Sequence, residues 1–153
     1  MGLSRTSTGK GVSHSDTSAV RKKQSDRVVS LAGNPNVGKS TVFNGLTGMT
    51  QHTGNWTGKT VSSALGRYEG EKQDYIFVDL PGCYSLNARS AEEEVTRDYL
   101  YFGDNDRVAV ICDASCLERN LFLAFQVLEA CDHAVLCLNL MDEAENKGFH
   151  IDT

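Results

Sequence analysis

The 153-residue sequence predicts an α/β fold in which a doubly wound, mostly parallel sheet carries helices on both faces. Two observations predict this fold. Short apolar runs alternate along the chain with segments of helical periodicity. The apolar runs are continuous rather than alternating, which is typical of strands covered on both sides in a parallel sheet. Ligands of such sheets bind at the carboxyl ends of the strands.

Glycine marks the end of the first strand and of the first helix. Residues 28–32 form a short apolar run that ends at Gly33, so they predict a buried strand. A helix is expected over 39–46, because Thr47 and Gly48 form a helix-ending signal.

The alternation of strand and helix continues along the chain. We expect strands over 61–69, 74–80, 107–113 and 133–138, and helices over 91–101 and 118–130. The run at 74–80 is strongly apolar and is expected in the centre of the sheet, whereas 61–69 alternates weakly and is expected at an edge. The last of these helices presents Leu121, Phe125 and Leu128 on one face.

Composition disfavours several classes of protein. No run of 18 apolar residues is present, so no membrane-spanning helix is expected. The first residues lack the apolar core of a secretory signal, which favours a cytoplasmic chain. The five cysteines include no C-x-x-C pair, so we expect reduced, mostly buried thiols rather than a zinc site or disulfides.

Charge divides the chain into two parts. Residues 1–27 carry six basic and two acidic side chains, a net charge of +4; since the whole chain carries −5, the remainder carries −9. An acidic body is a poor nucleic-acid binder, so no nucleic-acid partner is expected. We expect a disordered basic leader over residues 1–26 and the folded domain over residues 27–153. Contact of the leader with anionic lipid or RNA, or myristoylation of its MGLSRT start, is the alternative.

A complete phosphate-binding motif lies between the first strand and the first helix. Residues 33–40 read GNPNVGKS, which matches G-x-x-x-x-G-K-[ST] in full. The glycines let backbone N–H groups turn toward phosphate oxygens, and the helix N-terminus adds partial positive charge. In this motif Lys39 contacts the β- and γ-phosphates and the Ser40 hydroxyl ligates Mg²⁺. The residues expected at the nucleotide here are Asn34, Pro35, Asn36, Val37, Gly38, Lys39, Ser40 and Thr41.

A second motif, DLPG at residues 79–82, ends the most apolar strand. The Asp79 carboxylate there can hold Mg²⁺, usually through a water. The Gly82 N–H can contact the γ-phosphate, because no side chain blocks close approach. By itself the motif is also an ordinary strand-ending turn, and its place about forty residues after the phosphate loop gives it weight.

A third motif, NLMD, predicts which base is bound. Asn139 and Asp142 follow a later apolar strand. The Asp142 carboxylate can accept hydrogen bonds from guanine N1–H and the 2-amino group together, a donor pair that adenine lacks. A hydrogen bond to a charged group contributes roughly 1.5–3 kcal/mol. The motif therefore favours GTP over ATP.

The polar stretch 49–60 has no periodicity and is rich in Gly and Thr, so it predicts a long functional loop. Thr60 lies twenty positions after Ser40. Its hydroxyl can complete the Mg²⁺ shell when a γ-phosphate is present, which would make the loop an order–disorder switch.

From Val28 to Gly148 the sequence resembles the N-terminal GTPase domain of the bacterial ferrous iron transport protein B family. The matching segments are GNPNVGKST at 33–41, GNWTGKT at 54–60, DLPGCYSL at 79–86, LERNLFL at 117–123 and NLMDEAENKG at 139–148. The Gly-Asn-Trp run is the most specific of them, since GTPases in general share the phosphate loop but not that run or the Leu-Glu-Arg-Asn-Leu segment.

The resemblance implies a P-loop GTPase-type fold and slow, potassium-assisted GTP hydrolysis that regulates ferrous iron uptake. The residues it places at the reaction centre are Asn36, Lys39, Thr60 and Gly82, and those at Mg²⁺ are Ser40, Thr60 and Asp79. It also implies that Asn36 helps to hold K⁺, which would neutralise charge that develops on the transferring phosphoryl group.

The sequence departs from related GTPases at three positions. Cys83 follows Gly82 where Ras-like enzymes have a water-orienting Gln, so water positioning is expected to fall to loop backbone and K⁺. Cys83 as a nucleophile is the alternative. Thr57 stands where the family usually has Pro, and Lys59 where it has an apolar residue, which favours a more mobile first switch.

The length of the chain is the largest departure. It ends before the last strand and helix of a GTPase domain, so a truncated domain is expected. The helical domain and the transmembrane iron-permease domain would be its partners in the intact protein, at the cytoplasmic face of the inner membrane. Two alternatives to an enzyme stay open: a nucleotide-dependent switch module with little turnover, and a stand-alone soluble regulatory GTPase.

Overall fold

A computed structural model describes residues 25–48, 51–55 and 61–152. Its strands are β1 (Arg27–Gly33), β2 (Gln51–Asn55), β3 (Ser62–Glu69), β4 (Asp74–Asp79), β5 (Arg107–Asp113) and β6 (Ala134–Asn139). Its helices are α2 (Lys39–Thr47), α3 (Ala91–Phe102), the 3₁₀ turn η1 (Ala114–Cys116), α4 (Leu117–Ala130) and α5 (Met141–Asn146).

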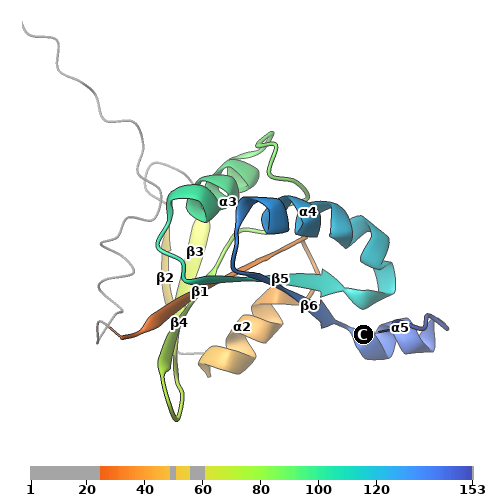
Figure 1. The fold of residues 1–153 in the computed structure, drawn as a ribbon, viewed down its shortest axis with the longest axis horizontal. Coiled ribbons are helices and arrows are strands. Elements are labelled where there is room, and N and C mark those ends of the chain that lie inside the picture. Colours follow the sequence, from red (N-terminus) through yellow and green to blue (C-terminus); the bar gives the residue numbers. More distant parts are fainter. Residues whose placement is uncertain (1–24, 49–50, 56–60, 153) are drawn as a thin grey trace, which may run out of the picture.

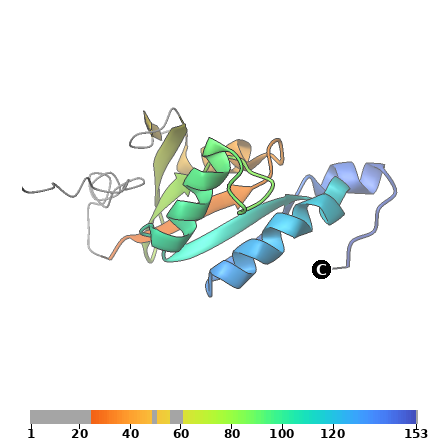
Figure 2. The same cartoon turned by 90° about the horizontal axis from the view of Figure 1, so that it is seen from above.

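The strands form one six-stranded sheet in the order β2-β3-β4-β1-β5-β6. The strands β4, β1, β5 and β6 run parallel, whereas β3 is antiparallel to β4 and β2 to β3. Helices α3 and α4 cover one face of the sheet and α2 covers the other, as Figures 1 and 2 show. The doubly wound, mostly parallel sheet predicted from the alternating pattern is confirmed.

The main core lies between the sheet and the pair α3 and α4. It contains Val28, Ile76, Val78, Val108 and Val110 from the strands, Val95 and Tyr99 from α3, and Leu123 and Val127 from α4. A smaller cluster of Leu31, Phe43 and Phe77 joins α2 to the opposite face. Because both faces of the central strands are covered, these strands are apolar throughout.

The edge of the sheet differs from expectation. The stretch 49–60, expected to be one loop, contains β2, which pairs with β3 from Gln51↔Gly66 to Asn55↔Ser62. The edge strand is therefore β2, and β3, which was expected at an edge, lies inside the sheet. The β2 sequence QHTGN has no apolar side chain. Hydrophobic periodicity therefore cannot predict a strand here, and the strand conformation of β2 depends on its pairing with β3.

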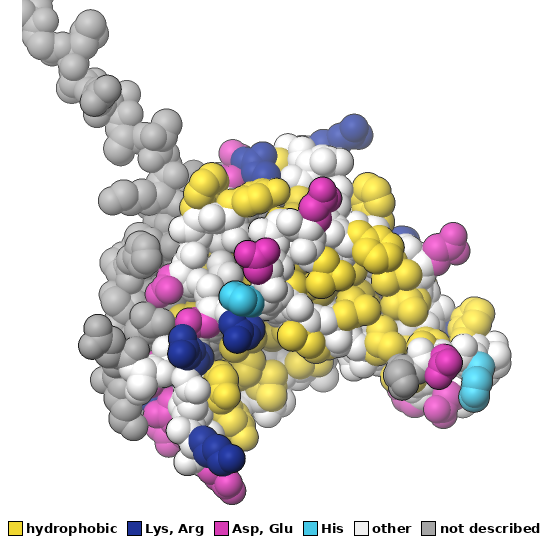
Figure 3. Space-filling view, in the orientation of Figure 1, with side chains coloured by type: hydrophobic (Ala, Val, Ile, Leu, Met, Phe, Trp, Pro, Cys, Tyr) yellow, Lys and Arg dark blue, Asp and Glu magenta, His cyan; other side chains and the backbone are white. Residues whose placement is uncertain are grey.

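The buried face of α4 also differs from expectation. The side chains that α4 buries are those of Asn120, Leu123, Ala124 and Val127. Phe125 and Leu128, on the face that the sequence shows as apolar, are 62% and 43% exposed, whereas Leu121 is half-buried and packs against the core. Val135 and Leu136 of β6, at the other edge, are also exposed. Figure 3 shows hydrophobic side chains gathered on the side where α4 and β6 lie.

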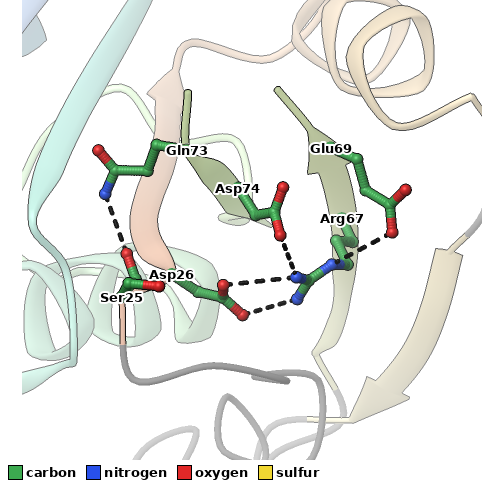
Figure 4. A network of polar contacts seen from close by, with 6 residues as sticks. All are labelled: Ser25, Asp26, Arg67, Glu69, Gln73 and Asp74. Carbon is green, nitrogen blue, oxygen red and sulfur yellow. Dashed lines mark hydrogen bonds and ion pairs between the residues drawn. The ribbon is translucent and has the colours of Figure 1, made fainter. Parts of the chain in front are cut away.

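An ion network joins three strands at the amino ends of β1 and β4 (Figure 4). The guanidinium of Arg67 contacts Asp26 and Asp74, each at 2.7 Å, and we call these three residues the Arg67 network. The Asp26 side chain has no exposed surface. Hydrogen bonds to Asp26, then to Asp74, raise the pKa of the Arg67 guanidinium above its ordinary value. The folded part thus includes Asp26, just before the boundary expected at residue 27.

Other expectations from composition concern membranes and cysteines. Within the described residues, no helix has the length and apolarity to cross a bilayer. All five cysteines have free thiols; Cys83 and Cys112 are buried, and the other three are half-buried. In the part of the chain that the structure describes, no three His, Cys, Asp or Glu side chains gather as a metal site.

Candidate nucleotide site

A cavity of about 350 Å³ lies at the carboxyl ends of β1 and β4. It is lined by Asn34, Pro35, Asn36, Gly38, Lys39, Ser40, Thr41 and Gly82. Seven of the eight residues expected from the phosphate motif line it. Val37 does not, because its side chain is 2% exposed and lies in the core.

The phosphate loop turns from β1 into α2 through two left-handed residues. Asn36 has φ 66° and Gly38 has φ 81°. Glycine and asparagine adopt this conformation with less strain than other residues. Helix α2 begins at Lys39, so its unpaired N-terminal N–H groups lie at the cavity. The local sequence thereby builds a concave, positively polarised anion site.

Lys39 and Asp79 form an ion pair beside this cavity. The Nζ of Lys39 contacts Oδ1 of Asp79, and the Ser40 hydroxyl donates to Oδ2 at 3.3 Å. The two ionic side chains are 9% and 15% exposed. One carboxylate therefore contacts both the expected phosphate-binding lysine and the expected metal-binding serine.

The oxygen atoms gathered here fit Mg²⁺. The Ser40 hydroxyl and the Asp79 carboxylate lie within hydrogen-bond distance of each other at the edge of the cavity. Hydroxyl and carboxylate oxygens are the ligands that Mg²⁺ takes beside substrate phosphates. Thr60, the third expected ligand, lies outside the described residues.

The segment after β4 is held against the phosphate loop by backbone hydrogen bonds. The N–H of Leu80 donates to Leu31 at 3.1 Å, and the N–H of Cys83 donates to Gly33 at 3.2 Å. A Cβ on Gly82 would lie 3.2 Å from the Cα of Pro35. The absence of a side chain at Gly82 is what permits this close approach.

Cys83 takes no part in the cavity. Its side chain is 2% exposed, and burial raises the pKa of its thiol to about 11. A thiol with this pKa is protonated at neutral pH, and the thiolate is the nucleophilic form. The geometry therefore speaks against the alternative that Cys83 is a nucleophile.

The base-reading motif is joined to the phosphate loop. The Nδ2 of Asn139 donates to the carbonyl of Val37 at 2.8 Å. A Cβ on Gly38 would lie 2.4 Å from that same Nδ2, so the contact requires glycine there. Leu140 is left-handed, with φ 57°, and the chain then enters α5, where Asp142 is exposed in the first turn. Asn139 thus fixes the phosphate loop relative to Asp142.

Helix α4 supplies contacts that sequence reasoning missed. The amide of Asn34, expected at the phosphates, donates to the carbonyl of Arg119 at 3.4 Å. The Arg119 guanidinium lies 5.4 Å from the centre of the Tyr84 ring. The Oε1 of Gln126 accepts from the N–H of Leu86 at 2.8 Å. The polar residues of the LERNL segment were the available signal, because such side chains at the start of an apolar helix need partners.

Comparison with known proteins places these features in a family. The family model described as "Ferrous iron transport protein B" matches residues 27–153. The Fe(2+) transporter FeoB of Methanocaldococcus jannaschii is 50% identical over 101 residues, which cover 66% of this chain and 15% of that protein. The chain therefore spans less than a fifth of the length of this relative.

Solved structures agree with the family model. The G domain of the T. maritima FeoB iron transporter has 39% identity and a TM-score of 0.78, over 83% of this chain and 77% of that chain. An S. thermophilus NFeoB mutant bound to GDP has 37% identity and a TM-score of 0.75, over 82% of this chain and 49% of that chain. Since the family model covers most of the chain and the fold and phosphate loop agree with it, the chain belongs to the ferrous iron transport protein B family and carries its N-terminal G-domain fold.

Proposed function

We propose that this chain binds GTP with Mg²⁺ and hydrolyses it slowly, with K⁺ assisting, to regulate ferrous iron uptake in the intact transporter. The observation that carries the proposal is that Lys39 and Ser40 line one cavity and both contact Asp79, while Asn139 is bonded to the same loop. The GDP bound to the S. thermophilus relative supports guanine nucleotide as the ligand.

The roles follow from the positions of the side chains. Lys39 and the N-terminal N–H groups of α2 bind the β- and γ-phosphates. Ser40 and Asp79, with Thr60, hold Mg²⁺, which supplies positive charge on the phosphate oxygens when bound. The Gly82 N–H contacts the γ-phosphate, and a water attacks that group in line with the leaving oxygen.

Asn36 is the residue that we assign to K⁺. Its side chain is exposed at the rim of the cavity, and its amide oxygen is a suitable donor for a monovalent cation. A cation at this position would neutralise charge on the transferring phosphoryl group, as an arginine finger does in other GTPases.

Guanine is selected by Asp142. Its carboxylate accepts from N1–H and the 2-amino group, and its exposure leaves it open to a base. The hydrogen bond from Asn139 to Val37 supports this assignment, because it joins the segment that carries Asp142 to the phosphate loop. In the intact protein, the proposal places the domain at the cytoplasmic face of the inner membrane, beside a helical domain and a transmembrane iron-permease domain.

Phosphate release from GTP tests the hydrolysis. We expect turnover to be faster in K⁺ than in Na⁺, and Asn36→Ala to abolish the difference. The wild-type chain in Na⁺ is the control for ionic strength. Tight GTP binding with no phosphate release in either salt would refute hydrolysis and leave a switch module.

Base preference tests the assignment of Asp142. Asp142→Asn replaces an acceptor with a donor, so affinity should move from GTP toward xanthosine triphosphate, by about 10- to 150-fold for a hydrogen bond of 1.5–3 kcal/mol to a charged group. Glu143→Gln, an exposed neighbour in the same helix turn, is the matched control and should leave base preference unchanged. Unchanged GTP affinity in Asp142→Asn would remove this residue from the base site.

A nucleotide-dependent switch module is the second candidate. The observation that favours it is the buried thiol of Cys83 at the position where Ras-like enzymes carry a water-orienting Gln. A module of this kind would bind GTP and GDP and signal through the loops around residues 60 and 82 with little turnover. The phosphate-release experiment distinguishes the two.

A further inference from the structure

A threonine of α3 reaches out of its own helix to the turn that follows β4. Thr96 has no exposed surface, and its hydroxyl donates to the carbonyl of Pro81 at 2.9 Å. From this contact we infer that Thr96 is a positioning residue: it directs the N–H of Gly82 toward the γ-phosphate and thereby makes the site discriminate GTP from GDP. The inference rests on the proposed nucleotide binding and adds a residue that none of the three sequence motifs contains.

The direction of this bond is unusual for a threonine inside a helix. Thr47 of α2 shows the common arrangement, because its hydroxyl donates at 2.9 Å to the carbonyl of Phe43, four residues earlier in the same helix. Thr96 lies in the middle of α3, and its hydroxyl instead joins α3 to a residue 15 positions earlier in the chain. A buried hydroxyl needs a partner, and that of Thr96 finds one in residues 81–83, which we call the 81–83 turn.

The bond to Pro81 sets the orientation of the next N–H. The peptide between Pro81 and Gly82 is trans and planar, so its C=O and N–H groups point in opposite directions. With the carbonyl held toward α3, the N–H is directed away from α3. Gly82 lines the phosphate cavity, and its N–H contacts no acceptor in the part of the chain that the structure describes. This N–H is therefore a donor available to a γ-phosphate in the cavity.

Two other contacts hold the 81–83 turn in place. The N–H of Cys83 donates to the carbonyl of Gly33 at 3.2 Å, which ties the turn to the phosphate loop. Burial raises the pKa of the Cys83 thiol to about 11, and a side-chain hydrogen bond with Thr96 opposes this rise. Thr96 thus contacts the residues on both sides of Gly82. The orientation of Gly82 depends on these neighbours.

A donor that is already oriented favours the nucleotide that carries a γ-phosphate. Such a donor needs no reorganisation when the charged group arrives. Without the Thr96 hydroxyl, the Pro81 carbonyl would lose its partner, and the peptide that carries the Gly82 N–H would no longer be held in one orientation. GTP would then lose a contact that GDP never makes, because GDP has no γ-phosphate. Removal of the hydroxyl should therefore weaken GTP binding selectively.

The ratio of two affinities tests the inference. The 153-residue chain is titrated, in excess Mg²⁺, with fluorescent analogues of GDP and of GMPPNP, a non-hydrolysable form of GTP. Thr96→Val keeps the shape of the side chain and removes the hydroxyl. Its affinity for GMPPNP should fall by about tenfold, the lower end for a hydrogen bond to a charged group, while its affinity for GDP stays the same. Thr96→Ser keeps the hydroxyl and should keep the wild-type ratio, whereas a purely structural role would lower both affinities together.

Two further variants control the result. Thr47→Val removes another buried threonine hydroxyl that donates to a backbone carbonyl, at the end of α2 opposite to the phosphate loop, and should leave the ratio unchanged. Thr96→Ala also removes the hydroxyl and favours the helix, so it should act as Thr96→Val does. An unchanged ratio in both Thr96→Val and Thr96→Ala, or an equal change in Thr47→Val or Thr96→Ser, would overturn the inference.

The wild-type chain supplies a test that needs no variant. Exchange of the Gly82 amide proton with solvent, followed by NMR, should be slower in the GMPPNP complex than in the GDP complex. Equal exchange in the two complexes would overturn the inference even if no Thr96 variant folded. Failure of the wild-type chain to bind either nucleotide would instead refute the proposed function, so the two failures are distinguishable.

Discussion

The two ends of the sheet hold a buried cation in different ways. At the amino end, Arg67 of β3 contacts the carboxylates of Asp74 in β4 and of Asp26, the residue before β1, each at 2.7 Å. At the carboxyl end, Lys39 contacts the one carboxylate of Asp79, which also accepts from Ser40. Glu69 adds a third carboxylate, 3.8 Å from the Nε of Arg67, so several negative charges surround the guanidinium, whereas Lys39 contacts the carboxylate of Asp79.

This difference separates a structural contact from an exchangeable one. A guanidinium surrounded by carboxylates is held in place by its planar donors, which tie β3, β4 and the residue before β1 to one another. A lysine that contacts one carboxylate can exchange it for a phosphate, provided that another cation then neutralises the carboxylate. The amino end should therefore govern the stability of the domain, and the carboxyl end should govern ligand affinity.

The largest expected effect is on stability, at the amino end. Arg67→Met removes the guanidinium that contacts the fully buried carboxylate of Asp26, and loss of one member of a buried pair costs about 3–5 kcal/mol in the free energy of unfolding. Because the Arg67 side chain is 12% exposed, we expect the lower end of that range, measured by urea unfolding.

Arg27→Met is the matched control for this prediction. Arg27 also pairs with an aspartate at 2.8 Å, Asp106, but its side chain is 58% exposed. Exposed ion pairs contribute up to about 1 kcal/mol, so the control should lower stability far less. Equal losses in the two variants would show that burial of Asp26 does not matter and that the amino end has no special role.

The next effect is on binding, at the carboxyl end. Lys39→Met removes a charged hydrogen-bond donor to phosphate, so affinity for GDP in Mg²⁺ should fall by about 10- to 150-fold, from the 1.5–3 kcal/mol of such a bond. The free energy of unfolding without nucleotide should fall less than in Arg67→Met, because Asp79 is 15% exposed and keeps its bond from Ser40.

Lys72→Met controls for the loss of one positive charge. Lys72 is exposed in the turn before β4 and should tolerate the substitution with no change in GDP affinity. If Lys39→Met lost as much stability as Arg67→Met, the two ends would be equivalent structural contacts, and the proposed division between them would fail.

Sequence motifs pointed to the residues at the carboxyl end of the sheet but not to the Arg67 network at the amino end. Lys39, Ser40 and Asp79 were assigned from motifs, because phosphate and metal chemistry demand particular side chains at particular spacings. Their contact with one another was not foreseen, since each had been assigned to a ligand. No motif marks the Arg67 network, whose members lie 41 and seven positions apart and meet only through strand pairing.

Contacts between distant residues are absent from sequence patterns, and this also explains the errors in the predicted fold. Strands whose apolar residues are buried on both faces were recognised from their own sequence, as β4 and β5 show. The polar strand β2 depends on its pairing with β3, a contact that sequence periodicity does not contain. On α4, the apolar side chains of Phe125 and Leu128 are exposed, whereas the buried face includes a polar residue, Asn120.

Asn120 is buried because its hydrogen bonds are satisfied. Its amide donates to the carbonyl of Cys116 at 2.9 Å, and its Oδ1 accepts from the N–H of Asp113 at 3.4 Å. A polar side chain with partners of this kind is compatible with the core, and no hydrophobicity pattern identifies it. Asn139 was assigned with Asp142 to guanine from its motif, and its hydrogen bond to Val37 of the phosphate loop was not foreseen.

The smallest expected effect concerns Cys83, which lies next to the exchangeable end without belonging to it. Cys83→Ser should leave GDP affinity and phosphate release unchanged, because the side chain points into the core. It should lower the free energy of unfolding by about 1–3 kcal/mol, because a buried hydroxyl needs a hydrogen-bond partner more than a thiol does. Cys112→Ser is the matched control, since burial raises the pKa of that thiol to about 11 as well and its strand, β5, does not line the cavity. If Cys83→Ser lost phosphate release and Cys112→Ser did not, Cys83 would belong to the reaction centre. The residues that govern ligand chemistry at the carboxyl end of the sheet would then include a side chain that does not line the cavity.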